Sequence, residues 1–124
     1  MKDFRDLKVW TKAHELALDC YTATASFPKQ EIFGIVAQIR RAGSSIGANI
    51  AEGCGRSGDG EFHRFLQMAM GSASELENHL LLARDSHFLQ ESSHRSIEMK
   101  VVETKKMLAA LIKKVGQDRH PEHR

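Results

Sequence analysis

The sequence predicts an all-α protein, an up-down-up-down antiparallel four-helix bundle. Apolar residues recur at alternating steps of four and three in four separate segments, which is the spacing of one face of a helix. No segment alternates apolar and polar residues for long enough to predict a strand. The connections between the segments are short, which favours antiparallel neighbours. The chain has 124 residues, and we assign a single bundle domain to residues 1–116 and a polar, frayed tail to residues 117–124.

The first helix is predicted to end at Phe27, because the residue before a proline disfavours the α region and Pro28 follows. The second is predicted to end in a glycine-rich turn, where Gly53 or Gly55 would act as the cap. The apolar seam of the first helix is Val9, Ala13, Leu16, Cys20, Ala23 and Phe27. The seam of the second is Ile32, Val36, Ile39, Gly43, Ile46 and Ile50.

The third helix is predicted to follow Asp59, and the fourth to be capped by Ser92 or Ser93. The seam of the third helix is Phe62, Leu66, Ala69, Ala73, Leu76, Leu80 and Ala83. The seam of the fourth is Ile97, Val101, Thr104, Leu108, Leu111 and Val115.

Composition places the chain among ordinary globular proteins, with 41% hydrophobic and 27% charged residues. Two cysteines, Cys20 and Cys54, do not suggest a disulfide framework. No apolar run approaches the ~20 residues that a membrane span needs. We therefore expect a cytoplasmic protein without a membrane partner.

Charge is distributed unevenly along the chain. Residues 58–91 carry two basic and six acidic side chains, a net of −4, whereas residues 92–124 carry eight basic and four acidic, a net of +4. A basic helix of this kind is typical of proteins that bind the phosphate backbone of RNA or DNA. The same charges also occur on an ordinary solvent-exposed face, and Glu98 and Glu103, which interrupt the basic residues, favour that alternative. The candidate nucleic-acid-binding residues are Lys100, Lys105, Lys106, Lys113 and Lys114.

Two enzyme patterns occur in residues 40–61. Residues 43–47 match G-x-S-x-G, and residues 53–58 match G-x-G-x-x-G. Each pattern needs a strand before it, and the preceding residues here have helical spacing. Gly43 and Gly47 instead allow a neighbouring helix to approach or mark a kink, and the later glycines separate two helices. We expect no catalytic residue and no cofactor.

A metal site is not expected either. Di-iron bundles need two Glu-x-x-His pairs and two further glutamates, and Glu91 with His94 forms the only such pair.

A polar stripe follows the second helix. At ~100° per residue, its members fall within an arc of about 80° that points away from the isoleucine seam. The stripe is either a solvated face or an interfacial hydrogen-bond network; its mixture of amides, small residues and single charges slightly favours the network. The stripe consists of Gln38, Arg41, Ser45, Asn49, Glu52 and Arg56. A comparable stripe on the third helix consists of Gln67, Gly71, Glu75 and Asn78.

Large side chains outside the seams suggest contact surfaces in an oligomer. They are Trp10, Tyr21, Phe33, Met68 and Leu82.

The sequence around this stripe resembles the 23S rRNA-intervening-sequence protein family, also known as four-helix bundle proteins. The main matches are the runs QIRRA at 38–42, SI at 45–46 and NIAEG at 49–53, followed by Arg56. Smaller matches extend the resemblance over roughly residues 4–115, from Trp10 to Leu111-Ile112. The family commonly has proline at the position of Gly47.

The resemblance implies a bacterial four-helix bundle without enzymatic activity whose relatives assemble as closed rings, notably homopentamers. The sequence is also similar to accessory proteins of diversity-generating retroelements, which bind a reverse transcriptase and nucleic acid. Two functions remain open. One is a ring-forming scaffold that binds nucleic acid or a nucleic-acid-processing protein such as a reverse transcriptase. The other is a homo-oligomeric protein-interaction module that binds no nucleic acid itself.

Overall fold

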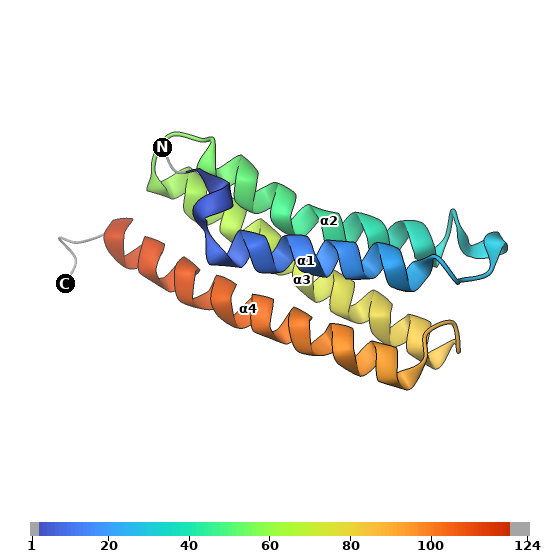
Figure 1. Cartoon of the computed structure of the whole chain (residues 1–124). Coiled ribbons are helices and arrows are strands. Elements are labelled where there is room, and N and C mark those ends of the chain that lie inside the picture. Colours follow the sequence, from blue (N-terminus) through green and yellow to red (C-terminus); the bar gives the residue numbers. More distant parts are fainter. Residues whose placement is uncertain (1–2, 120–124) are drawn as a thin grey trace.

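The computed structural model describes residues 3–119, and four antiparallel helices dominate this part of the chain (Figure 1). They are α1 (Lys8–Thr24), α2 (Ile35–Cys54), α3 (Asp59–Asp85) and α4 (Glu91–Arg119), with short 3-10 helices η1 (Phe4–Asp6) and η2 (Lys29–Glu31). Helices adjacent in sequence pack side by side, and α4 returns to α1. The packing is most extensive between α2 and α3 and least extensive between α1 and α4. The predicted all-α up-down bundle is confirmed.

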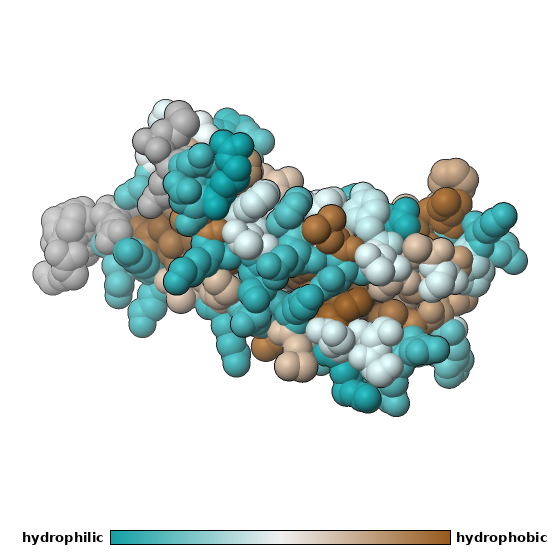
Figure 2. Space-filling view, viewed as in Figure 1, coloured by the Kyte–Doolittle hydropathy of each residue, from teal (hydrophilic) through white to brown (hydrophobic). Residues whose placement is uncertain are grey.

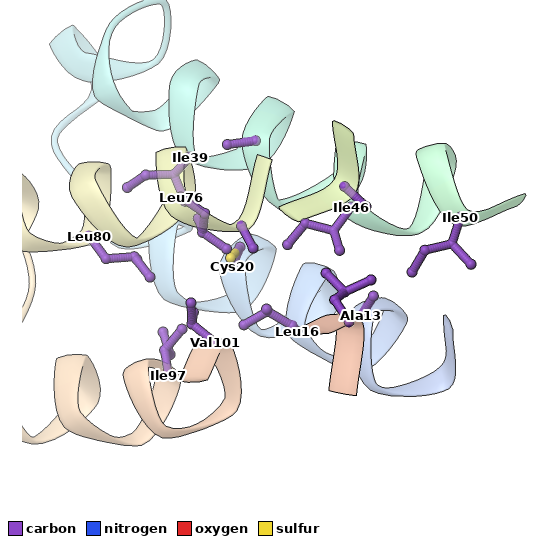
Figure 3. Close-up of a cluster of buried hydrophobic side chains, with 14 of the residues drawn as sticks. Ala13, Leu16, Cys20, Ile39, Ile46, Ile50, Leu76, Leu80, Ile97 and Val101 are labelled. Atoms are coloured by element: carbon purple, nitrogen blue, oxygen red, sulfur yellow. The ribbon is translucent and has the colours of Figure 1, made fainter. Parts of the chain in front are cut away.

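The predicted seams meet in the centre of the bundle. Leu16, Ile46 and Leu76 are fully buried, as are Ile50, Leu66, Val101 and Leu108. Figure 3 shows Leu16, Ile46, Leu76 and Val101, one from each helix, converging in the core. Fully burying such a side chain contributes about 1.5–3 kcal/mol, so the seams account for most of the stabilisation of the fold.

The connection between α1 and α2 differs from the prediction. Helix α1 ends at Thr24, and Phe27 is buried beyond it, with its ring centroid 5.9 Å from that of Phe88. Ile32 was predicted to be a seam residue, but it is 50% exposed. The reason is Gly34, whose non-helical backbone at φ −105° and ψ −115° delays the start of α2 to Ile35.

The start of α4 also corrects the prediction. Helix α4 begins at Glu91, so Ser92 and Ser93 lie in its first turn and do not cap it. The chain reverses earlier than expected because Leu89 is buried, and the Gln90 carbonyl already accepts the His94 N–H at 2.9 Å.

Two other helix ends differ slightly. Asp59 is the first residue of α3, and Gly58 precedes it at a positive φ of 84° that favours glycine. Helix α4 continues to Arg119, past the expected end of the bundle at residue 116; residues 120–124 lie outside the described part. Across residues 3–119, no helix combines the length and the hydropathy of a membrane span.

Candidate functional site: a polar stripe, a basic face and exposed apolar side chains

The polar stripe of α2 runs beside α3, and its centre joins the two helices. Arg41 donates hydrogen bonds to the Glu75 carboxylate on α3 and to Gln38 Oε1, the latter at 2.8 Å. His79 Nε2 lies 3.1 Å from Glu75 Oε2. The Arg41 guanidinium, and then His79, hold the pKa of Glu75 below its usual range. The stripe therefore contains a charged network within one chain.

This network stays accessible to solvent. The Arg41 side chain is 54% exposed and that of Glu75 38%, whereas His79 is 17% exposed. An ion pair of this exposure contributes about 0–1 kcal/mol. The Arg41–Glu75 pair therefore lies at the surface of the bundle, within reach of a further partner.

The other stripe residues bond mainly within α2. Ser45 Oγ donates to the Arg41 carbonyl at 2.7 Å, and Asn49 Nδ2 donates to the Ser45 carbonyl at 2.9 Å. Glu52 pairs with Arg56 at 2.9 Å, one turn away. Arg56 also lies over the Phe65 ring of α3, at 5.1 Å from its centroid. The structure therefore brings together Gln38, Arg41 and Glu75, while Ser45, Asn49 and Glu52 act locally.

The stripe predicted on α3 does not form a network. Gln67, Gly71 and Asn78 are exposed, and of this stripe only Glu75 turns toward α2.

The predicted basic residues divide into two groups. Lys100 pairs with Asp19 of α1, and Lys105 pairs with Glu77 of α3 at 2.9 Å. These two lysines connect α4 to its neighbours. Lys106, Lys113 and Lys114 are exposed and make no ion pair within the described residues. The free basic face of α4 is therefore smaller than the sequence suggested.

A hollow that the sequence did not indicate lies between α1 and α4. It has a volume of about 350 Å³, its floor includes Met107 and Leu111, and Lys8 and Lys114 border it. Figure 2 shows brown, hydrophobic atoms between the two helices at the end where η1 lies. The signal that could have revealed it is Met107, an apolar residue next to the predicted seam, together with the seam residue Leu111, which is only half-buried.

The enzyme patterns lack the strand that both require. Residues 43–47 lie inside α2, which runs without interruption through them. A Cβ on Gly43 would lie 3.2 Å from Cys20 Sγ, and one on Gly47 would lie 3.3 Å from Trp10 Nε1. These glycines therefore allow α1 to pack closely on α2.

The second pattern forms the turn between α2 and α3, beside a hollow of about 380 Å³. Asp59 and Glu61 occupy the first turn of α3, where a bound phosphate would meet their negative charge. Within residues 3–119, no group of three or more His, Cys, Asp or Glu side chains is placed to hold a metal ion. His94 is buried beside Glu98, with Nε2 3.2 Å from Oε1.

Several large hydrophobic side chains are exposed on the described part of the bundle. Trp10, one of the predicted contact residues, is half-buried within the chain and stacks on His14 with ring centroids 4.8 Å apart. Leu18, Met99 and Val102 lie outside the predicted seams and were not among the predicted contact residues. In the described part of the chain, the eight exposed residues are Leu18, Tyr21, Ile32, Phe33, Met68, Leu82, Met99 and Val102.

Comparison with known proteins agrees with this fold. Residues 5–110 match the model of the family described as 23S rRNA-intervening sequence protein. The chain is also similar to a protein of unknown function from the S23 ribosomal protein family of Bacteroides thetaiotaomicron, known from its crystal structure. That similarity has a TM-score of 0.77 at 30% identity and covers 85% of this chain and 98% of the other. No curated protein matches the chain.

Proposed function

The chain belongs to the 23S rRNA-intervening sequence protein family, and we propose that it is a non-enzymatic, ring-forming scaffold that binds nucleic acid or a nucleic-acid-processing protein such as a reverse transcriptase. The ring, a homopentamer in the resemblance noted above, would arrange several copies of the basic α4 around one axis. The number of α4 copies matters because each lysine that neutralises a phosphate adds only modestly to the affinity. Several copies in one assembly bind the same nucleic acid together and so raise the total affinity.

The observation that carries this proposal is the outward set of three lysines on α4. Lys106, Lys113 and Lys114 are exposed, and no carboxylate of the described chain neutralises them. Lys100 and Lys105 already have carboxylate partners on α1 and α3. Phosphate oxygens would therefore contact Lys106, Lys113 and Lys114 more readily than Lys100 and Lys105.

Filter binding to RNA and to DNA at about 50 and about 200 mM salt tests the proposal. Replacing Lys106, Lys113 and Lys114 by alanine should weaken binding several-fold and lower the slope of log K against log salt by about one for each lysine lost from a phosphate contact. The matched control is Lys100→Ala with Lys105→Ala, which should reduce binding less. Equal losses in both variants would contradict the assignment of the basic face, and no binding at low salt would exclude nucleic acid as the ligand.

A second candidate is a homo-oligomeric protein-interaction module that binds no nucleic acid itself. The observation that favours it is Phe33, a large aromatic side chain that is 93% exposed, since aromatic residues are enriched at protein interfaces. An assembly that forms but does not bind RNA or DNA at low salt would support this candidate over the first.

A further inference from the structure

The contact between α1 and α4 changes character toward the end of the bundle where η1 lies. These two helices pack on each other less extensively than any other neighbouring pair. Lys12 of α1 pairs with Glu103 of α4 at 3.0 Å. One helical turn closer to η1, Lys8 makes no ion pair with a described residue, and the next residues of α4 at four-residue steps are Met107 and Leu111. Ion pairing between the two helices therefore gives way to an apolar surface at this end.

The hollow at this place is apolar and faces solvent. It has a volume of about 350 Å³. Figure 2 shows its brown, hydrophobic atoms at the surface, and in Figure 1 α4 continues past the start of α1. Three of its apolar lining residues are half-buried, so a further apolar group that covers them removes more of their area from water. The apolar lining residues are Leu7, Val9, Met107, Ala110 and Leu111.

The charged side chains that line the hollow are both lysines. Lys8 of α1 and Lys114 of α4 are exposed, and neither makes an ion pair with another described residue. Three other hollows on the described chain are lined by charges of both signs. The α1–α4 hollow differs from them because its cations are not offset by a lining carboxylate. Its surface is therefore complementary to a segment that carries apolar and acidic residues side by side.

The lining favours a protein segment over a nucleic acid. Single-stranded nucleic acids stack their bases on aromatic side chains, and none of the described residues that line the hollow is aromatic. A phosphate backbone could pair with the lysines, but it would leave Met107 and Leu111 without an apolar partner. Methionine is an adaptable side chain that is frequent at surfaces that bind varied protein partners.

The fold also limits the conformation of such a segment. An extended peptide adds to the exposed edge of a sheet, and residues 3–119 contain no strand. A groove between two helices instead receives the apolar face of a third helix. Met107 and Lys114 are seven residues apart, which is about 10 Å along α4 and corresponds to two turns of an incoming helix.

We propose that the α1–α4 hollow binds an acidic amphipathic helix of a partner protein. The apolar residues of that helix, spaced at i, i+3 or i+4, and i+7, cover Met107 and Leu111. Its carboxylates flank the apolar residues and pair with Lys8 and Lys114. The inference goes beyond the proposed function, since it requires neither a ring nor bound nucleic acid.

Fluorescence anisotropy with a labelled synthetic peptide tests the contact on the full chain. The probe contains leucine, alanine and glutamate, with leucines in one helical stripe and glutamates beside it. It is about 20 residues long, because shorter isolated helices are marginal in water. A second peptide has the same composition in scrambled order, and a third has lysine in place of each glutamate.

The three peptides should bind with different affinities. At about 50 mM salt, the acidic striped peptide should bind about tenfold more tightly than the scrambled or the basic peptide. Its affinity should fall at about 200 mM salt, because the lysines are exposed and salt screens their charges. Equal affinities for the three peptides, or no binding of the acidic striped peptide, would overturn the proposal.

Two adjacent alanines provide matched variants of the hollow. Ala110 lines it and Ala109 does not, and both are exposed on α4. Ala110→Glu places a carboxylate where the apolar residues of the peptide bind and should weaken binding about tenfold. Ala109→Glu changes the net charge equally and should leave the affinity unchanged. Circular dichroism should show the same helical content for both variants, and equal losses of affinity would refute the assignment of the hollow.

Two pairs of lysines separate the local charge from the net charge. Lys8→Gln with Lys114→Gln removes both lining cations and should weaken peptide binding several-fold. Lys106→Gln with Lys113→Gln removes the same net charge, but neither residue lines the hollow, and the loss should be smaller. In filter binding to RNA the order should be reversed, because Lys106 and Lys113 are two of the three lysines assigned to nucleic acid. Equal losses of peptide binding in the two double variants would contradict the pairing with Lys8 and Lys114.

The remaining outcomes separate this inference from the proposed function. A chain that binds the acidic striped peptide but no RNA would support the hollow and contradict direct nucleic-acid binding. A chain that binds RNA but not the peptide would overturn the inference and leave the proposed function in place. Binding of decanoate below its micellar concentration, without binding of the peptide, would assign the hollow to a small amphiphile and also overturn the inference.

Discussion

At the scale of single residues, Glu75 is the carboxylate on which the interhelical network depends. Its pKa is lowered by Arg41 and, to a smaller extent, by His79. A lowered carboxyl pKa stabilises the folded state above the pKa of the unfolded chain, and this contribution is lost as pH falls through the folded value. The network should therefore contribute to the free energy of unfolding at neutral pH, and this contribution should be lost in acid.

Replacing Glu75 by glutamine should lower the free energy of unfolding at pH 7 by up to about 1 kcal/mol, because the pair is exposed. Urea unfolding at pH 7, 5 and 3 measures the effect, and the difference from the original chain should disappear at pH 3. Glu52→Gln is the control, since Glu52 pairs with Arg56, four residues later in the chain, and with no residue of α3 in the described part. A pH-independent difference for Glu75→Gln would show that the carboxylate does not act by its charge.

Gly53 marks the closest approach of α2 and α3. A Cβ there would lie 2.9 Å from Phe65 Cβ and 3.0 Å from Phe62 Cδ1. Gly53→Ala should therefore destabilise the protein by about 1–3 kcal/mol through overpacking, despite the better helix propensity of alanine. Gly71→Ala is the control, because nothing lies within 4 Å of a Cβ at Gly71. It should gain up to about 1 kcal/mol, and equal stabilities for the two variants in thermal unfolding would refute the close contact.

Cys20 should be inert while the protein is folded. Burial raises the pKa of its thiol to about 12, so almost no thiolate exists at pH 8. Iodoacetamide should label it only when the chain unfolds, in proportion to the urea transition followed by circular dichroism. Labelling of Cys20 in native buffer, located by mass spectrometry, would mean that α1 opens locally from the bundle.

At the scale of helices, α3 ends in a hydrogen-bonded turn that has an unfavourable residue at its centre. The Phe88 N–H donates to the Ala83 carbonyl at 2.9 Å, and the His87 N–H donates to that of Arg84 at 3.0 Å. His87 has a positive φ of 68°, the left-handed conformation in which glycine is preferred.

His87→Gly should raise the free energy of unfolding by about 1 kcal/mol, since a side chain in this conformation costs about 1–2 kcal/mol. Ser86→Gly, at a φ of −88°, is the control and should not stabilise the protein. A loss of stability in His87→Gly would indicate that the imidazole makes a favourable contact.

The helices were largely predictable from the sequence because burial follows a local period. Val36, Ile39, Ile46 and Ile50 are all buried as the spacing indicated. The errors lie at helix ends, where one backbone conformation decides the outcome. Because the backbone of Gly34 is not helical, Ile32 lies outside α2 and its buried seam. The turn through His87 lets α4 begin before Ser92.

The candidate surfaces were less predictable because their partners are distant in sequence. Lys100 and Lys105 belong to the predicted basic set, but their carboxylates lie 81 and 28 residues away, on other helices. The polar spacing left open whether Arg41 faces solvent or a neighbouring helix, and the packing of α2 on α3 shows that it contacts Glu75. Sequence spacing gives the direction of a side chain along its own helix, and the other helices determine what it meets.

At the scale of the whole molecule, the bundle has two ends of different character. Most of the exposed apolar side chains lie near the α1–α2 and α3–α4 connections, while Lys113 and Lys114 lie toward the end of α4. The exposed lysines of the second end form the part of the surface that the proposed nucleic-acid binding would use.

The central claim is that several copies associate into one closed assembly, and native mass spectrometry of the full chain at low micromolar concentration tests it most directly. We expect a single discrete species of more than two copies, with few incomplete assemblies beside it. The family resemblance implies five copies. A chain that remains monomeric, or an unbounded series of increasing masses, would contradict the account.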